Sequence, residues 1–507
     1  MNLLDELSHV NLDPAVLDHV RDLLQQTHHQ ADIIKLRDIK IQALTLELAR
    51  YRRLQFGQKT EAFTSEQHEL FDETFAIDIA AIENDIEQQA QTSPAPTKRA
   101  RAGRQQLPEH LPRIEHRHEP ESCSCEQCGQ NLVKIGEDVS EQLDIEPARF
   151  FVHRHIRPQY ACRHCETIQA APVPAAIIDG GMAAPGLLAW MAVSKFVDHL
   201  PLYRLEQIAS RQDVILSRST LAYWVGRIGV ALQPLADRLA DLLRQRHVLH
   251  ADETPVAQLD PGEGKTKRAY LWTYRSNDLE TGPPIVVLDY QTSRSGRHAK
   301  AFLQAWKGHL MVDDYGGYKA LFREGITELG CLAHVRRKFF DLHAANSSPV
   351  AATALTRIAQ LYLIETEGKE LAPAERQRLR QQKAKPVLTE FYQWLSTTRL
   401  GVAMGSALAK AIDYALKRWN ALVRYADSGD LPIDNNPAEN TLRPIAIGRK
   451  NWLFAGSERA GQRAAAIQSL LGTAKLNGRD PQAWLKETLE KLPTWPNSRI
   501  DELLPFA

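Results

Sequence analysis

The sequence lacks the features that would anchor the protein in a membrane or hold it together with disulfides. No stretch of its 507 residues approaches the roughly 18 uncharged apolar residues that a membrane span requires. The first residues, MNLLDELSHVNLDP, have neither the basic n-region nor the apolar h-region of a secretory signal. Six cysteines are too few for a disulfide scaffold in a chain of this length. We therefore expect a cytoplasmic protein of several domains with no membrane partner.

The charges are segregated along the chain, although the formal net charge is +0. Residues 1–92 hold 17 Asp and Glu against 8 Lys and Arg, a net charge of −9, so the remaining residues carry +9. The segment 92–113 contains four prolines and is typical of a linker. This segment has a basic cluster that consists of Lys98, Arg99, Arg101 and Arg104. The cluster could contact DNA phosphates, or it could simply be solvated as part of the linker.

The acidic N-terminal part contains a predicted helix over residues 15–55. Apolar residues recur there at one heptad position if Thr27 fills a gap, which favours a short coiled coil: Val20, Ile34, Ile41 and Leu48. Self-association through this helix and packing of an amphipathic helix within one subunit both fit the pattern.

Two C-x-x-C pairs predict a tetrahedral zinc site. Cys125 and Cys128 form the first pair, and Cys162 and Cys165 form the second after 33 intervening residues. Each C-x-x-C turn aims two thiolates at one point, and the segment between the pairs alternates like the strands of a zinc ribbon. Four unrelated thiols or a redox motif are the alternatives, but the βαβ context of a thioredoxin-type motif is missing. The pattern thus predicts one structural Zn²⁺.

Residues 185–232 are expected to be helical and to include a helix-turn-helix. The segments 202–212 and 218–232 have suitable lengths, with Ser219 as the expected N-cap of the second helix. Its first turn would present three side chains to a DNA groove, namely Arg218, Thr220 and Tyr223. Helix pairs with a short turn are also common in ordinary cores, so a purely structural role stays open.

From residue 246 the pattern changes to β-strands. We expect three consecutive strands, a helix, a fourth strand, a helix and a fifth strand that runs into another helix. The strands are expected over residues 246–259, 267–276, 283–293, 309–315 and, with the start of the following helix, 326–335. This is the order of a ribonuclease-H-like fold, in which a central mixed sheet holds carboxylates on neighbouring strands. The chain as a whole is therefore predicted to be a multi-domain protein of mixed α and β structure.

The first and fourth strands of such a sheet are neighbours, which brings Asp252 and Asp313 together. Two-metal phosphoryl transfer needs carboxylates of this kind around two divalent ions roughly 3.5–4 Å apart. Hard oxygen ligands select Mg²⁺ or Mn²⁺ rather than zinc. We expect two such ions per active site.

A helical stretch, about residues 349–426, precedes the candidate third carboxylate, Glu439. The run from Asn436 to Glu439 also matches a capping box with Asn436 as the N-cap, and both roles can hold together. Bases and an aromatic residue that follow suit a substrate of phosphates and unstacked bases: Arg443, Arg449, Lys450 and Trp452. Arg443 lies one helical turn after Glu439, so an ion pair between them is the structural alternative.

These motifs together resemble the insertion-sequence transposases of family sixty-six (IS66), a branch of the bacterial DDE transposases. The resemblance rests on the two C-x-x-C pairs and on HADET (250–254), VDDYGGY (312–318), CLAH (331–334) and DNNPAENTLRPIAIGRKNWLFAGS (434–457). It implies that Asp252, Asp313 and Glu439 form the catalytic, metal-binding triad. It also implies that Cys331 and His334 order the active site or nearby DNA, while a plain structural role stays open for both.

One position departs from the pattern of the family. The residue after the second catalytic Asp is usually Gly in this family, whereas this chain has Asp314. Asp314 therefore remains an alternative to Asp313 as the second metal ligand.

The resemblance implies a division of the chain into six parts. These are an N-terminal helical or coiled-coil region (1–91), a basic proline-rich linker (92–113), a zinc-ribbon domain (114–175), a helical helix-turn-helix region (176–240), a ribonuclease-H-like DDE catalytic domain with the helical insertion (241–460) and a C-terminal helical domain (461–507).

The expected function is that of a transposase of a bacterial insertion sequence. Such an enzyme binds double-stranded DNA at the terminal inverted repeats of its element, cuts the ends and joins them to target DNA. We expect a homo-oligomer, at least a dimer on DNA, that is associated with the nucleoid and works with accessory proteins of the same element. The alternatives are a structure-specific nuclease of the same fold and a zinc-dependent DNA-binding regulator without activity.

Overall fold

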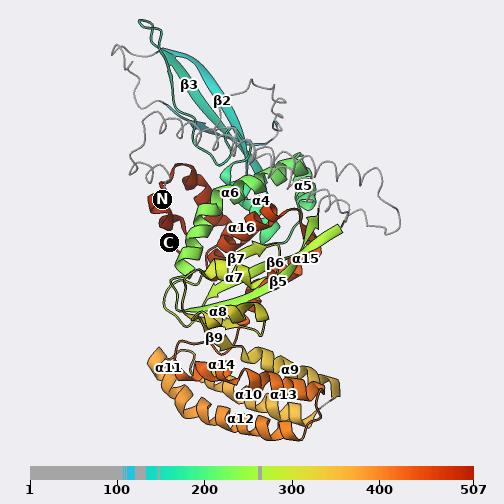
Figure 1. The fold of residues 1–507 in the computed structure, drawn as a ribbon. Coiled ribbons are helices and arrows are strands. Elements are labelled where there is room, and N and C mark those ends of the chain that lie inside the picture. Colours follow the sequence, from blue (N-terminus) through green and yellow to red (C-terminus); the bar gives the residue numbers. More distant parts are fainter. Residues whose placement is uncertain are drawn as a thin grey trace, which may run out of the picture.

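The computed structural model describes residues 107, 109, 111–119, 133–146, 149–260, 265–346 and 348–507. The segment predicted to form an N-terminal coiled coil, the basic cluster of the linker and the first cysteine pair, Cys125 and Cys128, lie outside these residues. The molecule is elongated, with a long β-hairpin at one end, a sheet flanked by helices in the middle and a helical bundle at the other end (Figure 1). The architecture is mixed α/β.

A small sheet contains the hairpin. Its strands are β1 (Arg113–Arg117), β2 (Val133–Glu146), β3 (Arg149–Ala161) and β4 (Ile168–Ala170). β2 and β3 pair antiparallel along their whole length, while β1 runs parallel to the middle of β3 and β4 pairs antiparallel with its end. The strands that the sequence predicts between the two cysteine pairs are thus present.

Three helices follow: α4 (Pro185–Phe196), α5 (Leu202–Ser210) and α6 (Arg218–Leu243). A short turn joins α5 to α6, as predicted, but the N-cap of α6 is Ser217, whose Oγ accepts a hydrogen bond from the backbone N–H of Thr220 at 3.1 Å. The prediction of Ser219 as the cap is therefore wrong. A cap needs the extended backbone that Ser217 adopts, with φ −72° and ψ 150°, whereas Ser219 already lies inside the first turn.

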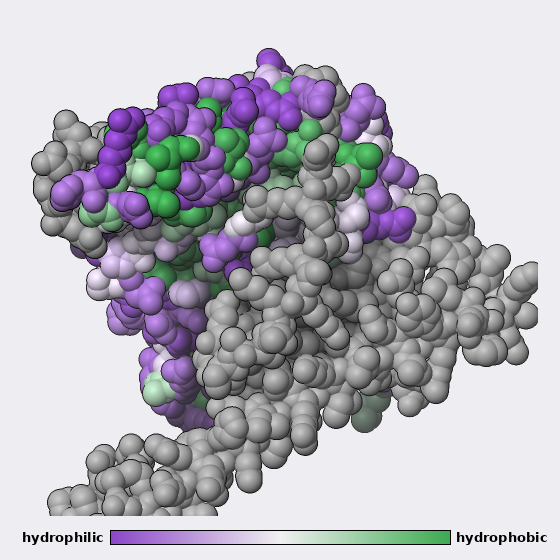
Figure 2. Space-filling view, turned by 90° about the horizontal axis from the view of Figure 1, so that it is seen from above, coloured by the Kyte–Doolittle hydropathy of each residue, from purple (hydrophilic) through white to green (hydrophobic). Residues whose placement is uncertain are grey.

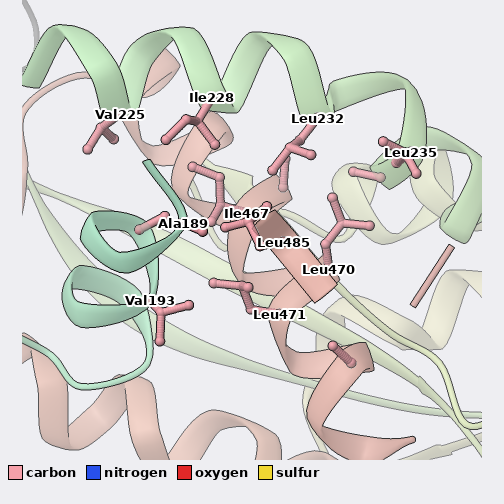
Figure 3. Packing of buried hydrophobic residues seen from close by; sticks show 14 of the residues in the cluster. Ala189, Val193, Val225, Ile228, Leu232, Leu235, Ile467, Leu470, Leu471 and Leu485 are labelled. Carbon is pink, nitrogen blue, oxygen red and sulfur yellow. The ribbon is translucent and has the colours of Figure 1, made fainter. Parts of the chain in front are cut away.

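The main apolar core joins these helices to the C-terminal helices α16 (Glu458–Leu476) and α17 (Pro481–Lys491). Figure 3 shows side chains of α6 pointing down toward α4 and α16, and these α6 residues are Val225, Ile228, Leu232 and Leu235. Their spacing of three and four residues places them on one face of the helix. The short 3-10 helices η4 (Leu492–Thr494) and η5 (Asn497–Leu503) end the chain.

The central sheet has the strand order β7-β6-β5-β8-β9. Its strands are β5 (Val248–Asp260), β6 (Lys265–Ser276), β7 (Val286–Gln291), β8 (His309–Val312) and β9 (Thr327–Gly330), with α7 (Gly296–Leu303), η1 (Gly316–Tyr318) and α8 (Lys319–Arg323) in the connections. The first three strands are antiparallel, whereas β8 and β9 run parallel to β5. The predicted adjacency of the first and fourth strands is confirmed.

Helix α16 covers the outer edge of β7. Ser469 Oγ accepts a hydrogen bond from the N–H of Leu288 at 2.8 Å, and Thr473 Oγ1 accepts one from the N–H of Val286 at 3.2 Å. An uncovered edge strand exposes unpaired backbone groups that can recruit another strand. The two buried hydroxyls satisfy these groups and attach the C-terminal helices to the sheet.

A helical bundle follows β9 and has an apolar core of its own. It is built from α9 (Leu332–Asn346), α10 (Pro349–Glu367), α11 (Pro373–Leu379), the π-helical turn η2 (Arg380–Ala384), α12 (Lys385–Leu400), α13 (Ala407–Lys417), α14 (Trp419–Val423) and the 3-10 helix η3 (Arg424–Asp427). The helical insertion predicted over about 349–426 is present, and α9 packs with it. The chain then returns to the sheet through α15 (Asn436–Trp452) and the short strand β10 (Phe454–Ala455), which pairs with β5.

In Figure 2, the coloured part of the surface seen from above is mostly hydrophilic, with patches of apolar residues between the polar ones. Among the described residues, each helix is too short or too polar to cross a lipid bilayer.

Candidate active site

β5 and β8 bring Asp252 and Asp313 to equivalent positions on neighbouring strands. In their parallel register His250 lies opposite Met311. Asp252 lies two residues further along β5, and Asp313 lies two residues after Met311, just past the end of β8. Adjacent strands are about 4.8 Å apart. The pairing between β5 and β8 ends before Asp252 is reached, and β10 pairs with β5 further along, at Ala257 and Gln258.

The two aspartates share their electrostatic environment with Glu439. Burial, followed by the charge of the neighbouring Glu253, raises the pKa of Asp252 to about 7, and the charges of Asp313 and Glu439 add to this rise. Negative charges that converge in a partly buried site raise each other's proton affinity. A divalent cation between the carboxylates would remove this repulsion.

Asp314, the alternative to Asp313, is neutralised within the fold. Its Oδ1 accepts a hydrogen bond from Nη1 of the buried Arg418 at 2.7 Å and lies 3.5 Å from Lys319 Nζ. Burial alone would raise the pKa of Asp314, but the hydrogen bond and charge of Arg418 hold it below its ordinary value. Asp313, by contrast, has no ion pair with a cation of the described residues.

Glu439 lies in the first turn of α15 and faces α9. The helix begins at Asn436 with Asn435 as the N-cap, and no side chain makes a capping hydrogen bond. The predicted capping box is therefore wrong, because the helix starts one residue earlier and Glu439 is no longer its third residue. Glu439 Oε2 instead accepts a hydrogen bond from Arg337 Nη2 at 3.0 Å. Its Oε1 is buried without a hydrogen-bond partner, 3.6 Å from His334 Nδ1.

Cys331, His334 and Glu439 each offer one possible ligand atom, and these atoms lie within 4.8 Å of one another. Burial raises the pKa of the Cys331 thiol to about 12, and its Sγ accepts a hydrogen bond from the backbone N–H of Asn435 at 3.2 Å. Burial also lowers the pKa of His334, against the charges of Glu439 and Asp313. The protonated thiol suits a role in bracing the start of α15. His334, whose lowered pKa favours the neutral form, can position Glu439 or bind a metal ion together with it.

Two polar residues that the sequence analysis did not select fix α15 against the sheet. Asn435 Nδ2 donates to the carbonyl oxygen of Ala251 at 2.9 Å, and Asn435 Oδ1 lies 3.1 Å from His250 Nδ1, which donates to it. Both side chains are fully buried. Ala251 precedes Asp252, and Asn435 precedes the helix that carries Glu439, so this contact ties two candidate ligands together. Their place inside HADET and DNNPAEN is the signal that could have found them.

A buried ion pair lies beside the candidate carboxylates. Glu253, whose side chain is 1% exposed, accepts hydrogen bonds from Arg294 Nε and the Tyr318 hydroxyl, both at 2.8 Å. The Arg294 guanidinium lies 3.8 Å from the ring centre of Tyr315, whose backbone N–H donates to Asp313 Oδ1 at 2.8 Å. A chain of contacts thus runs from Glu253 to Asp313. Arg294 belongs to no motif, so local sequence gave no signal for it.

The predicted DNA-binding residues of α15 differ in their surroundings. Arg443 and Lys450 are exposed, whereas Arg449 Nη1 donates to Thr254 Oγ1 at 3.2 Å and to the carbonyl oxygen of Pro255 at 2.8 Å. Arg443 and Lys450 are therefore accessible to a ligand, and Arg449 attaches α15 to β5.

The other predicted DNA-binding residues are partly engaged in the fold. Arg218 Nε donates to Glu206 Oε2 at 2.9 Å, which links α6 to α5. The backbone of Thr220 is held by the N-cap, and Tyr223 is partly buried against the main core. Trp452 is partly buried against the small apolar cluster between α15 and the sheet.

Cys162 and Cys165 lie in a tight turn at the end of β3. The N–H of Cys162 donates to the carbonyl oxygen of Thr167, and the N–H of Glu166 donates to the carbonyl oxygen of Cys162, both at 2.9 Å. Glu166 closes the turn with a left-handed φ of 58°. Neither cysteine forms a disulfide with another described cysteine, and the turn suits a knuckle that offers two thiolates to one ion.

Four family models match the sequence. The model described as the transposase IS66 family matches residues 180–463, which is more than half of the chain. The zinc-finger binding domain of transposase IS66 matches 122–166, the IS66 C-terminal element matches 469–506, and the model described as transposase C of IS166 homeodomain matches 43–115.

Two relatives from one organism align with most of this chain. The uncharacterized protein y4jD of Sinorhizobium fredii is 40% identical over 413 residues, which cover 79% of this chain and 81% of that protein. The uncharacterized protein y4qI of the same organism is 38% identical over 485 residues, which cover 92% of this chain and 89% of that protein. The resemblance inferred from the motifs is confirmed, and the chain belongs to the IS66 transposase family.

Proposed function

We propose that this transposase cuts the ends of a mobile DNA element and joins them to target DNA, with Asp252, Asp313 and Glu439 as its catalytic and metal-binding residues. The observation that carries the proposal is the convergence of these carboxylates from β5, β8 and α15, in a site where burial and neighbouring acids raise the pKa of Asp252 to about 7. Strongly shifted pKa values are typical of functional sites, and a bound cation would remove the repulsion between these carboxylates.

A ribonuclease-H-like fold for residues 241–460 is part of this proposal. The support is the strand order, with three antiparallel strands followed by two parallel ones and with β5 next to β8. The helical bundle between β9 and α15 corresponds to an insertion ahead of the third carboxylate.

The residues fit two Mg²⁺ or Mn²⁺ ions. All three candidate ligands are hard carboxylate oxygens, and Glu439 Oε1 is buried without a hydrogen-bond donor. Bound there, the ions would activate the attacking oxygen and stabilise the leaving one. The protein's own groups position the carboxylates through the contacts of Asn435 and Arg294. We assign Asp313 rather than Asp314 as the second ligand, because Arg418 already neutralises Asp314.

We propose that the parts before the sheet domain recognise the DNA together with exposed bases of α15. One zinc ion would be held by Cys125, Cys128, Cys162 and Cys165. The basic linker, the first turn of α6 and the exposed Arg443 and Lys450 would contact the DNA backbone. The enzyme would act as a homo-oligomer, at least a dimer, on nucleoid DNA, with accessory proteins of the same element.

A strand-transfer assay with terminal-repeat DNA and Mg²⁺ tests the proposal. Purified protein should cut the repeat end and join its 3′ hydroxyl to a target plasmid, and the Asp252→Asn protein should do neither while still binding DNA. Cutting without joining would identify a nuclease. Binding without cutting under all divalent ions would identify a regulator.

The zinc site has a separate test. Metal analysis of the purified protein should find about one zinc per chain, and the Cys162→Ser protein should have lost it. Disulfides among the four cysteines of the native protein would contradict the assignment.

A further inference from the structure

Two His-Arg-His tripeptides lie on neighbouring strands of the small sheet. One runs from His116 to His118 at the end of β1, and the other from His153 to His155 in β3. The two strands are parallel, and His116 lies directly opposite His155. Alternate residues of a strand point to the same face. The four imidazoles therefore gather on one face of the sheet.

The four rings form one connected cluster. The ring centre of His116 lies 5.0 Å from that of His153 and 5.1 Å from that of His155. The ring centre of His118 lies 5.4 Å from that of His155. Each β1 histidine faces a β3 histidine through ring nitrogens, with 2.8 Å between His116 Nε2 and His153 Nδ1 and 3.1 Å between His118 Nε2 and His155 Nδ1.

A buried carboxylate orients the first pair. Asp144 of β2 is 2% exposed, and its Oδ2 lies 2.6 Å from His153 Nε2. An ionised carboxylate only accepts hydrogen bonds, so His153 carries its proton on Nε2 and aims the lone pair of Nδ1 at His116. A carboxylate that accepts the outer N–H of an imidazole is the usual support of a metal-bound histidine.

The second pair has an unused polar atom. His155 Nε2 is buried and has no hydrogen-bond partner among the described residues. Burial, followed by the charges of the three other histidines, lowers the pKa of His155 to about 4, and burial also lowers the pKa of His116. The neutral imidazole is the form that binds a metal ion.

We propose that these histidines bind one divalent transition-metal ion of the Zn²⁺, Ni²⁺ and Cu²⁺ class, at a site separate from the cysteine knuckle. Metal–nitrogen bonds of about 2.0–2.1 Å place two tetrahedral ligands about 3.3 Å apart, so each facing pair needs to open only slightly to chelate an ion. His116 and His153 form the core of the site. His155, whose ring centre is 5.1 Å from that of His116, is the candidate third ligand and would have to rotate its side chain to reach the ion.

The position of the site gives it a mechanical consequence. β1 is the first described strand after the linker, and five residue pairs join it to β3. An ion bound by His116 and His153 would cross-link β1 to β3 and would thereby fix the direction of the chain that precedes β1.

Calorimetric titration of the untagged, full-length, zinc-loaded protein with Ni²⁺ tests the proposal, in saturating Mg²⁺ so that the carboxylate site is already occupied. One Ni²⁺ should bind per chain without release of zinc. The His116→Gln/His153→Gln double variant should bind none, whereas His247→Gln, a change at an exposed histidine elsewhere, should bind as the original does. The Asp144→Asn variant should bind about 10–100-fold more weakly, as expected for loss of an outer-shell carboxylate.

Binding of no Ni²⁺ beyond that exchanged for zinc would overturn the proposal, as would full binding by the double variant. Because either variant could fold poorly, the original protein supplies a second readout. Electron paramagnetic resonance of one equivalent of Cu²⁺ should show coupling to at least two imidazole nitrogens. Coupling to fewer would also overturn the proposal.

Discussion

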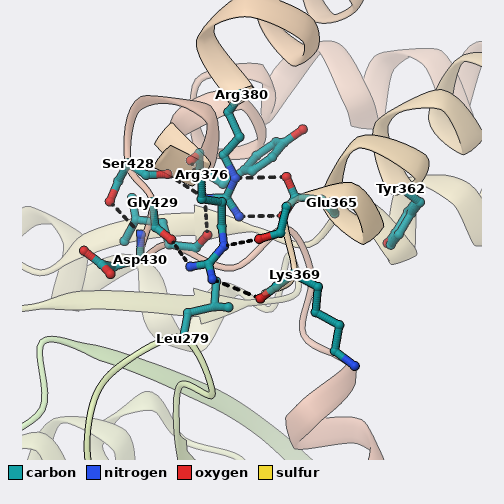
Figure 4. A network of polar contacts seen from close by, with 12 residues as sticks. Leu279, Tyr362, Glu365, Lys369, Arg376, Arg380, Ser428, Gly429 and Asp430 are labelled. Atoms are coloured by element: carbon teal, nitrogen blue, oxygen red, sulfur yellow. Dashed lines mark hydrogen bonds and ion pairs between the residues drawn. The ribbon is translucent and has the colours of Figure 1, made fainter. Parts of the chain in front are cut away.

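The helical insertion and the carboxylate site on the inner strands of the central sheet both bury charged groups. They differ in how completely these groups are paired. In the insertion, Arg380 is fully buried and pairs with Glu365 through two nitrogens, at 2.9 and 2.5 Å (Figure 4). Its remaining nitrogen donates to backbone carbonyl oxygens, including those of Tyr425 at 3.0 Å and Leu431 at 2.9 Å. Arg376, beside it, donates to carbonyl oxygens such as that of Gly429 at 2.7 Å.

The carboxylate site on the inner strands of the sheet has fewer compensating partners. Burial, together with the charges of Glu253, Asp313 and Glu439, raises the pKa of Asp252 to about 7. Glu439 Oε1 and His334 Nδ1 are buried without hydrogen-bond partners. A buried charge whose partners are complete supports the fold, whereas a group of unpaired acceptors costs stability and is retained where a ligand completes it.

The largest effect should come from the second candidate ligand. The Asp313→Asn protein should lose strand transfer by on the order of 10³-fold or more, since an amide cannot hold a divalent ion as a carboxylate does. The Asp314→Asn protein should keep most of its activity and instead unfold more easily, because it leaves the buried Arg418 with Glu328 as its one remaining carboxylate partner among the described residues. Strand transfer and thermal unfolding of both variants decide the matter, and the reverse pattern would assign Asp314 as the ligand.

The next effect concerns the fully paired charges. Arg380→Met should destabilise the protein by about 3–5 kcal/mol, because Glu365 and several carbonyl oxygens would lose their buried partner. Lys383→Met in the same π-helical turn removes only an exposed pair with Glu367 and should cost about 0–1 kcal/mol. Chemical denaturation measures both. Equal effects would show that burial of the pair does not matter.

Two features could be predicted from the sequence: the order of the strands, and the placement of Asp252 and Asp313 at or beside neighbouring strands. Both depend on local patterns, namely alternating apolar residues and family motifs. Residues whose partners are distant in the chain were missed. Asn435 contacts His250 across 185 positions, and Arg294 contacts Glu253 across 41. Helix starts failed for a related reason: Ser217 and Ser219 are equally good caps by composition, and only the packed backbone decides between them.

A smaller effect is expected from the ion pair that supports the candidate ligands. Glu253→Gln should cost about 1–3 kcal/mol of stability, since it weakens the bonds from Arg294 and Tyr318 to a side chain with 1% exposure. It should also raise the Mg²⁺ concentration needed for half-maximal strand transfer, because the network reaches Asp313 through Tyr315. Arg294→Ala should raise this Mg²⁺ concentration as well, and Arg294→Lys should raise it less. A stability loss with unchanged Mg²⁺ dependence would limit the network to a structural role.

The smallest effect should come from Arg337, which is the cation that Glu439 holds in the absence of metal. The Arg337 side chain is 60% exposed, so its pair with Glu439 contributes only about 0.2–1 kcal/mol. Because Glu439 must exchange Arg337 for an ion, Arg337→Gln should tighten Mn²⁺ binding to the DNA-free protein by at most about fivefold. Arg336→Gln, which removes the same charge one residue away without touching Glu439, should change Mn²⁺ binding less. If both variants tighten it equally, the effect is one of general charge, and Glu439 is not shown to exchange partners.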